Sequence, residues 1–327
     1  MNPQLATHLT SPIDSTTRDE LLFRLWGSVS STKGDFRYMQ SYFDWYCQQF
    51  LLDGGRHVSI STHAHVTKIA DKMQQDKERA ELYRDVSQQQ LGESTPNTID
   101  GSLNLCSRLL LMMSIGELPL GIDENYFGPG AGIKLQPDKP QIGRIFTALN
   151  LRKIGGMRIE WTGNITDHLR LADDDKTVSI FHCVAFLKFQ RKVHRQIFPI
   201  NFIDETLRTL SLLFPQNDNK AQLWLESQIQ DFGLDPLLAE CGSLATHERR
   251  FENFNYWNNR LVILKQALED SRPQTLSQWW FDRRNGVQWY TFWVAILVFL
   301  VIIFFGLVQS IEGALQVYLS WKSLYHE

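Results

Sequence analysis

The residues best suited to chemistry are three histidines, His57, His63 and His65, which lie close together in the sequence. On a strand, side chains two positions apart point the same way, and imidazoles at His63 and His65 could bind zinc or another metal. Ser61-Thr62 is instead typical of a helix start, and on a helix such positions diverge. Structural zinc sites need four converging ligands, and no further ligand motif lies nearby. We therefore expect no metal site and no cofactor. If the chain did bind a metal, His57, His63 and His65 would be the candidate ligands.

Other motifs point weakly to chemistry. Asp173–Asp175 lacks the spacing and closing glutamate of an EF-hand, which favours a solvated turn. Gly128–Gly132 could approach a phosphate, but no Gly-Lys-Ser/Thr follows, which favours a flexible connection. Cys183 follows His182 only in sequence, whereas a nucleophile and its base must meet in space. The chain holds no GxSxG, HExxH or kinase signature, so it leans away from an enzyme. An enzyme with an unrecognised site near the three histidines or the Gly-rich loop is the alternative.

A modest basic cluster spans Lys188–Arg195 and could contact nucleic acid or anionic lipid. Its aromatic interleaving is thin, which favours a solvated helix face. The 33 Lys+Arg and 36 Asp+Glu give a net charge of −3. This balance provides no global attraction to nucleic acid, so we do not expect that partner.

The composition of the 327-residue chain, 43% hydrophobic and 21% charged, is that of a folded protein. It excludes a collagen, a disordered chain and a polytopic membrane protein. Four widely spaced cysteines form no CxxC pair and are too few for a disulfide scaffold. Buried free thiols in a reducing compartment are expected at Cys47, Cys106, Cys183 and Cys241.

Hydrophobic periodicity predicts a mainly α-helical (α+β) cytosolic domain with a small β-hairpin and one C-terminal transmembrane helix. Thr17–Glu20 has the form of a capping box, and further helices are expected over Thr62–Gln89, Leu103–Ile115 and Thr246–Asp270. The expected order is a disordered N-terminus 1–16, a helical region 17–91, a linker with a short helix and Gly/Pro-rich loop 92–143, a helix-strand-hairpin subdomain 144–200, a helical region 201–270, a juxtamembrane segment 273–288, the span 289–310 and a tail 311–327.

The 144–200 subdomain combines two kinds of pattern. Met157, Ile159 and Trp161 alternate with polar residues, as in a half-buried strand, and Asn164 can cap a short helix. Leu169–Leu171 and Val178–Ile180 flank a polar turn and predict a hairpin. This order is compatible with a winged-helix-like unit, and a small α+β subdomain fits equally.

The most informative segment is the apolar run Tyr290–Val308, which holds no charged residue. As a helix it spans about 28 Å, close to the roughly 30 Å hydrocarbon thickness of a bilayer. Core helices are usually shorter, so the run predicts a membrane span that includes Tyr290, Trp293, Phe304 and Val308. Tryptophans and tyrosines flank it, as expected at membrane–water interfaces.

The charges beside the span predict its orientation. Arg272, Arg283 and Arg284 precede it, and only Lys322 follows. Basic residues favour the cytosolic side, so we expect the large N-terminal part in the cytosol. The N-terminus resembles no secretory signal, and a span this near the C-terminus indicates a tail-anchored protein. The sequon at Asn164 should then stay unglycosylated.

Small residues recur on one face of the predicted span, at Gly306, Ser310 and Ala314. Such spacing lets two membrane helices approach closely, and Gln309 beside this face could hydrogen-bond across a pair. A homodimer is therefore one hypothesis. Ordinary small residues near a helix end explain the spacing equally well.

Leu276–Ala295, Phe305–Gln309 and Gly313–Gln316 together resemble the tail of a large group of uncharacterised single-pass membrane proteins of filamentous fungi. Ile159–Thr162, Asp167–Leu169 and Val178–His182 resemble the middle of the same group. The resemblance covers roughly residues 18–320 and implies a fungal, membrane-anchored protein. It implies no activity, cofactor or catalytic residue, because none is established for the group.

These observations predict a non-enzymatic protein-interaction or scaffolding module that a C-terminal helix holds in a lipid bilayer. Its expected partners are the bilayer, other proteins or a second copy. The alternatives are the enzyme described above and a winged-helix-like reader of nucleic acid or protein tethered to a membrane.

Overall fold

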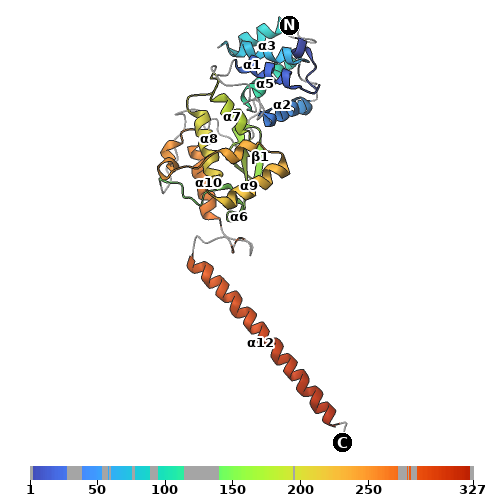
Figure 1. The fold of residues 1–327 in the computed structure, drawn as a ribbon, viewed down its shortest axis with the longest axis vertical. Coiled ribbons are helices and arrows are strands. Elements are labelled where there is room, and N and C mark those ends of the chain that lie inside the picture. Colours follow the sequence, from blue (N-terminus) through green and yellow to red (C-terminus); the bar gives the residue numbers. More distant parts are fainter. Residues whose placement is uncertain are drawn as a thin grey trace. The chain divides into compact units, whose positions relative to one another are not determined.

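The computed structural model describes residues 3–27, 39–53, 58, 60–75, 78–88, 95–113, 140–193, 196–271, 278, 280 and 286–324. Two units can be distinguished: Met1–Arg152 with Met157–Asp270, and Lys153–Gly156 with Ser271–Glu327. We call the first the folded body and the second the C-terminal unit. Figure 1 shows that helices predominate and that the C-terminal unit contains one long helix.

The N-terminal half of the body is helical. It comprises η1 (Pro3–Ala6), α1 (Ser15–Trp26), α2 (Gln40–Asp53), α3 (His63–Met73), α4 (Arg79–Ser87) and α5 (Pro96–Leu111). Helices α1, α3 and α5 pack together (Figure 1). Their core includes Trp26 and Tyr42, which are fully buried with ring centroids 5.4 Å apart. Tyr42 also stacks on Phe186 at 5.7 Å, which joins α2 to the second half of the body.

The first helix begins earlier than the capping-box pattern predicts. Asp14 is the N-cap, and its Oδ1 accepts the Thr17 backbone amide at 2.8 Å. Thr17 lies inside the helix and is buried. Aspartate is as good an N-cap as serine or threonine, so the earlier acidic residue sets the boundary.

Two further helix boundaries were predicted wrongly. The single helix expected over Thr62–Gln89 is two helices, α3 and α4. Part of the expected linker is helical, because α5 begins at Pro96. The Thr95 hydroxyl accepts the Thr98 amide, and the Thr98 hydroxyl accepts the Thr95 amide. Threonine thus takes the place in this capping box where the sequence rule looks for glutamate or glutamine.

Residues 3–16 contain ordered structure where disorder was expected. Leu5 and Leu9 are 4% and 5% exposed. The Leu9 amide donates to the Ser61 carbonyl at 3.0 Å, and His8 forms an isolated bridge with Thr62. This segment therefore belongs to the body.

The middle of the body contains the small sheet. This middle part consists of α6 (Ala148–Lys153), β1 (Arg158–Thr162), η4 (Ile165–Asp167), β2 (Arg170–Ala172) and β3 (Thr177–Phe181). The predicted hairpin is confirmed, since β2 pairs antiparallel with β3. β1 pairs with β3 in parallel, so the strand order is β1-β3-β2. The turn between β2 and β3 holds Asp173–Asp175 with positive φ.

The second half of the body is again mostly helical. It comprises α7 (Val184–Gln190), α8 (Phe202–Leu213), α9 (Asn219–Phe232), η5 (Pro236–Glu240), η6 (Thr246–Arg249), η7 (Phe251–Asn253) and α10 (Asn258–Asp270). The helix predicted from Thr246 starts only at Asn258, because two short 3₁₀ segments precede it. Its apolar stripe of Leu261, Leu264 and Leu268 is buried, so this face packs into the core.

The C-terminal unit contains α12, Gly286–Leu324. This helix includes the predicted span 289–310 and continues without a break, so the described part of the expected tail, 311–324, is also helical. At 39 residues it is about 58 Å long, roughly twice a bilayer's hydrocarbon thickness.

Candidate functional site

Helix α12 has the features of a membrane anchor. Within the described residues, Trp289–Ser323 is the one helical segment long and apolar enough to cross a membrane. The most apolar 18-residue stretch of this segment has a mean hydropathy of 2.9, and none of its residues is buried. Tyr290 and Phe304 of the predicted span are 66% and 61% exposed. In water such exposure would be costly, whereas in hydrocarbon it would be favourable.

Aromatic rings cluster at the N-terminal end of α12. Trp280 and Trp293 meet edge to face with centroids 5.0 Å apart, and Trp289 lies 5.1 Å from Tyr290 in the same manner. Amphipathic rings favour the boundary between hydrocarbon and water. Arg283 and Arg284, which were predicted to set the topology, lie outside the described residues.

The small-residue face of α12 is open. Gly306, Ser310 and Ala314 are exposed, and a Cβ added at Gly306 would meet no atom within 4 Å. The Ser310 hydroxyl donates to the Gly306 carbonyl at 2.8 Å, within the helix itself. Self-association through this face stays a prediction. Val308, the last residue of the apolar run, is half-buried.

The histidine cluster does not form a metal site in the described structure. His63 is the first residue of α3, its side chain is buried, and its Nδ1 lies 2.9 Å from the Tyr46 hydroxyl. Burial lowers its pKa to about 4, with a smaller effect from His8. His65 turns its Nδ1 to the Ser61 amide at 3.3 Å. The described residues contain no group of three or more His, Cys, Asp or Glu able to hold a metal; His57 lies outside them.

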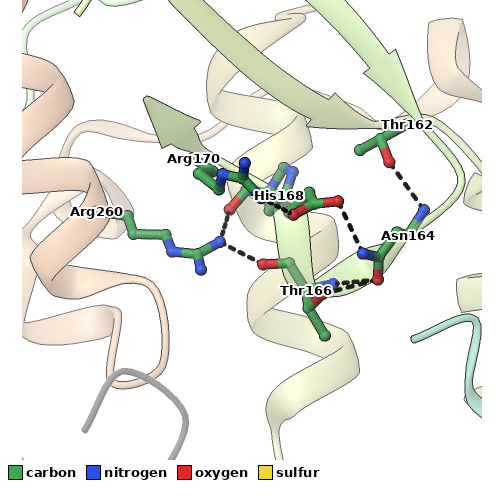
Figure 2. Close-up of polar contacts among 7 residues, drawn as sticks. Thr162, Asn164, Thr166, His168, Arg170 and Arg260 are labelled. Carbon is green, nitrogen blue, oxygen red and sulfur yellow. Dashed lines mark hydrogen bonds and ion pairs between the residues drawn. The ribbon is translucent and has the colours of Figure 1, made fainter. Parts of the chain in front are cut away.

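A buried polar centre lies where the segment between β1 and β2 meets α10 (Figure 2). Arg260 is 8% exposed, and its Nη1 donates to the carbonyls of Thr166 and His168 at 2.7 and 2.5 Å. Its guanidinium also lies 5.5 Å from the Trp257 ring centroid. Arginine cannot lose its charge, so these carbonyls and the indole ring supply its stabilisation.

His168 occupies the middle of this centre and is fully buried. Its Nδ1 accepts the Phe181 amide at 3.2 Å, which assigns the ring proton to Nε2, 2.7 Å from the Thr209 hydroxyl. Burial, and secondarily the nearby Arg260 charge, lower its pKa to about 3. A neutral imidazole whose two nitrogens are both engaged holds the sheet to α8 and is not free to exchange protons with a substrate.

The outer edge of the same centre is a turn closed by Asn164. Its side-chain oxygen accepts the Thr166 amide and hydroxyl at 3.1 and 2.8 Å. Its side-chain amide donates to Asp167, which forms an ion pair with Arg170 at 2.6 Å (Figure 2). This arrangement confirms the predicted cap at Asn164 and explains how the chain passes from β1 to β2.

Two buried carboxylates serve similar structural ends. Glu205, 2% exposed, accepts the backbone amides of Asn255, Tyr256 and Trp257 at 2.8, 2.7 and 2.8 Å. Asp235, fully buried, accepts hydrogen bonds from the Ser41 hydroxyl and the Ala185 amide. Burial raises the pKa of both groups, and these hydrogen bonds oppose the shift.

The remaining candidates are also held in structural contacts. Burial, then Asp235, raise the pKa of the Cys183 thiol, so it is protonated and unreactive. In the basic cluster, Lys188 forms an ion pair with Glu240 at 3.7 Å and Arg191 with Asp204 at 2.8 Å. The Gly128–Gly132 loop lies outside the described residues.

Sequence reasoning did not identify His168, Glu205, Asp235 or Arg260 as important. Each partners a backbone group that is distant in sequence, and no local spacing encodes such a contact. Their local sequence does not single them out either, since Glu205 lies between Asp204 and Thr206, and Arg260 follows two asparagines.

No protein-family model, curated protein or solved structure matches this chain. What the residues can do is therefore inferred from their own contacts.

Proposed function

We propose that this protein is a single-pass, tail-anchored membrane protein whose folded body lies in the cytosol and serves as a protein-interaction or scaffolding module at the membrane surface. The observation that carries the proposal is the exposed apolar surface of α12. An apolar run of this length has no place in water, and a bilayer covers it completely. The anchor would concentrate the body and its partners in two dimensions.

The proposed orientation is supported by charge. Arg272, Arg283 and Arg284 all precede α12. Lys322 lies near the C-terminal end of this helix. The sequon at Asn164 cannot report orientation, because the Asn164 side-chain amide is already hydrogen-bonded to Asp167 at 2.7 Å. A folded body would resist glycosylation there on either side of a membrane.

Orientation is best tested by protease protection in sealed membranes of cells that express the full chain. Two versions of the chain are compared, one with an epitope tag at the N-terminus and one with the same tag at the C-terminus. We expect protease to remove the N-terminal tag and to spare the C-terminal tag until detergent is added. Protection of the N-terminal tag would overturn the cytosolic assignment.

The interaction role is tested by affinity purification of the detergent-solubilised protein with and without residues 273–327. Partners of the body should copurify with both forms. A clean monomer without partners in both would count against a scaffolding module. Partners seen only with the full chain would place the interaction on the C-terminal unit.

A winged-helix-like reader at residues 144–200 is the alternative, and the structure favours it less. Such a reader needs an exposed basic helix beside its hairpin. In α7 most side chains are buried, and Lys188 and the neighbouring Arg191 pair with Glu240 and Asp204. The parallel pairing of β1 with β3 also differs from a simple antiparallel wing.

A further inference from the structure

The folded body contains a second feature that the anchor does not explain, a polar cleft of about 780 Å³. Four segments line it: residues 143–146 before α6, residues 211–215 at the end of α8, residues 217–220 at the start of α9, and residues 243–249, which include η6. Clefts of this size accommodate small molecules. None of its lining residues belongs to the His168 centre.

The charges in the cleft are mostly positive. Arg144, Lys220 and Arg249 line it, and Asp218 is the one acidic residue among the described lining residues. Arg144 and Lys220 are exposed at its rim, whereas Arg249 is only 9% exposed. The cleft therefore has a net charge of +2.

Arg249 is the distinctive residue. Among the described residues its Nη2 donates to the Thr246 hydroxyl at 3.5 Å, the outer limit of a hydrogen bond, and its buried Nε has no partner. No described carboxylate forms an ion pair with Arg249, whereas the adjacent Arg250 pairs with Glu252 at 3.0 Å. A guanidinium is always charged and has five N–H donors. Burying it without a counter-charge is costly, so the position favours an anionic ligand.

The walls of the cleft are held in place by hydrogen bonds that join these segments and the residues beside them. The Ile142 amide donates to the Arg249 carbonyl at 2.8 Å, and the Gln141 side chain donates to the Thr246 carbonyl at 2.8 Å. On the other side, the Asn217 amide donates to the Ser243 hydroxyl oxygen at 3.2 Å. A site whose walls are fixed before binding loses little entropy when a ligand enters.

Asp218 limits what the start of α9 can contribute. Its Oδ1 accepts the amides of Lys220 and Ala221, both at 3.1 Å, so these two donors are already used by the cap. Recognition must therefore come from the side chains of Arg144, Lys220 and Arg249. The Ser243 and Thr246 hydroxyls, which accept the hydrogen bonds above, can each donate their own proton.

We infer that this cleft binds a phosphate group, with Arg249 as its central ligand and Arg144 and Lys220 at its rim. A phosphate monoester carries nearly two negative charges near neutral pH, which matches the net charge of the cleft. Its oxygens accept paired hydrogen bonds from a guanidinium. The phosphate belongs to a soluble phosphorylated metabolite or to a phosphorylated lipid headgroup, which share this chemistry. The inference does not depend on the function of α12.

The first test is titration of inorganic phosphate into the full-length protein in detergent, by isothermal calorimetry, with the ionic strength held constant within each titration and raised from one titration to the next. We expect saturable binding whose affinity falls as sodium chloride replaces an inert osmolyte. Absence of binding at millimolar phosphate would overturn the inference.

The second test compares two neighbouring arginines. Arg249→Gln should weaken phosphate binding about tenfold or more, because charged hydrogen bonds are lost. Arg250→Gln changes the net charge equally but lies outside the cleft, so it should leave the affinity unchanged. Equal losses in both variants would reduce the effect to general electrostatics and contradict a specific site.

The stability of the unbound protein separates binding from folding. If Arg249 serves phosphate, Arg249→Gln should unfold at the wild-type temperature or above it, because an unpaired charge is removed. A lower unfolding temperature would mean that Arg249 stabilises the body. In that case phosphate binding is measured for the double variant Arg144→Gln with Lys220→Gln. Both side chains are exposed and neither is part of the core, so this variant tests binding without disturbing folding. The inference predicts about a tenfold loss for that double variant, and wild-type affinity would overturn it.

The two sources of phosphate are distinguished with two further probes in the same assay, glucose 6-phosphate and a water-soluble short-chain phosphatidylinositol 4-phosphate. Tighter binding of the sugar phosphate indicates a soluble metabolite. Tighter binding of the lipid indicates a headgroup. Failure of both to compete with inorganic phosphate would overturn the assignment of a phosphate monoester.

Discussion

Helices α10 and α12 contain the same apolar residue types in opposite surroundings. Leu261 and Leu264 of α10 are fully buried, whereas Leu297 and Leu300 of α12 are 62% and 59% exposed. In the folded body the chain removes its apolar surface from water by packing. In α12 it has no such packing and requires an apolar solvent instead. The same hydrophobic effect therefore produces a core in one unit and, in the other, a helix long and apolar enough to cross a bilayer.

The largest expected effect comes from separating the two units. A chain truncated after Asp270 should move entirely from the carbonate-resistant membrane pellet to the soluble fraction, because it lacks α12. The truncated chain should unfold at the same temperature as the folded body of the full chain, because the folded body contains its own core. A full chain whose apolar run is replaced by leucines of equal length should remain in the membrane pellet. A truncated body that still pellets after carbonate extraction would break the comparison.

Acid should destabilise the body through its buried histidines. Burial lowers the pKa of His63 to about 4 and that of His168 to about 3, below the unfolded value near 6.5. The unfolded chain therefore binds protons that the folded chain does not, and stability falls as the pH drops below about 6.5. By pH 5 each histidine should cost about 2 kcal/mol of unfolding free energy. Denaturant unfolding of the truncated body at several pH values measures this slope.

A matched variant checks the origin of the acid effect. His63→Gln keeps a polar partner for Tyr46 but cannot titrate, so the slope between pH 6.5 and 5 should become shallower. Glu205 and Asp235 act in the opposite direction, because their raised pKa values make protonation favour the folded state at lower pH. A slope in His63→Gln as steep as that of the wild type between pH 6.5 and 5 would contradict this account.

A pair of identical substitutions compares the two units directly. Leu264→Ala should lower the free energy of unfolding of the body by about 3 kcal/mol, because it removes packed methyl groups from a closed core. Leu300→Ala in α12 should leave that free energy unchanged. Denaturant melts of both variants in detergent provide the measurement. Equal destabilisation by both would mean that α12 contributes to the core of the body.

The smallest expected effect concerns the open face of α12. If Gly306, Ser310 and Ala314 form a contact between two copies, Gly306→Ile should weaken association in a membrane reporter assay by about 1 kcal/mol. Leu307→Ile, one position away from this face, is the control. Undiminished association of Gly306→Ile would end the dimer hypothesis.

Much of the fold was predictable where local signals were strong. The alternation at Ile159 and Trp161, the cap at Asn164 and the hairpin 169–180 all appear as expected, because each depends on residues close together in sequence. Helix boundaries were less predictable. Asp14 and Thr95 act as caps that the simple pattern did not favour, and η6 and η7 replace the first part of the helix expected from Thr246.

The candidate sites divide in the same way. The anchor could be predicted, because length and apolarity are properties of a continuous segment. The cleft could not, because Arg144, Lys220 and Arg249 come from separate segments. Their convergence depends on the hydrogen bonds that hold residues 141–142 against 246–249 and Asn217 against Ser243.

By itself the sequence determined that one run near the C-terminus can cross a bilayer and that the rest is a mainly helical folded domain. Hydrophobic run length and periodicity are local, so no tertiary contact is needed to see them. Only the tertiary structure decided which polar residues are buried. It left His168 neutral and Arg260 satisfied by carbonyls, and it left Arg249 charged beside a cleft. Such outcomes depend on which backbone groups and charges meet in space, and the chain brings them together only when it folds.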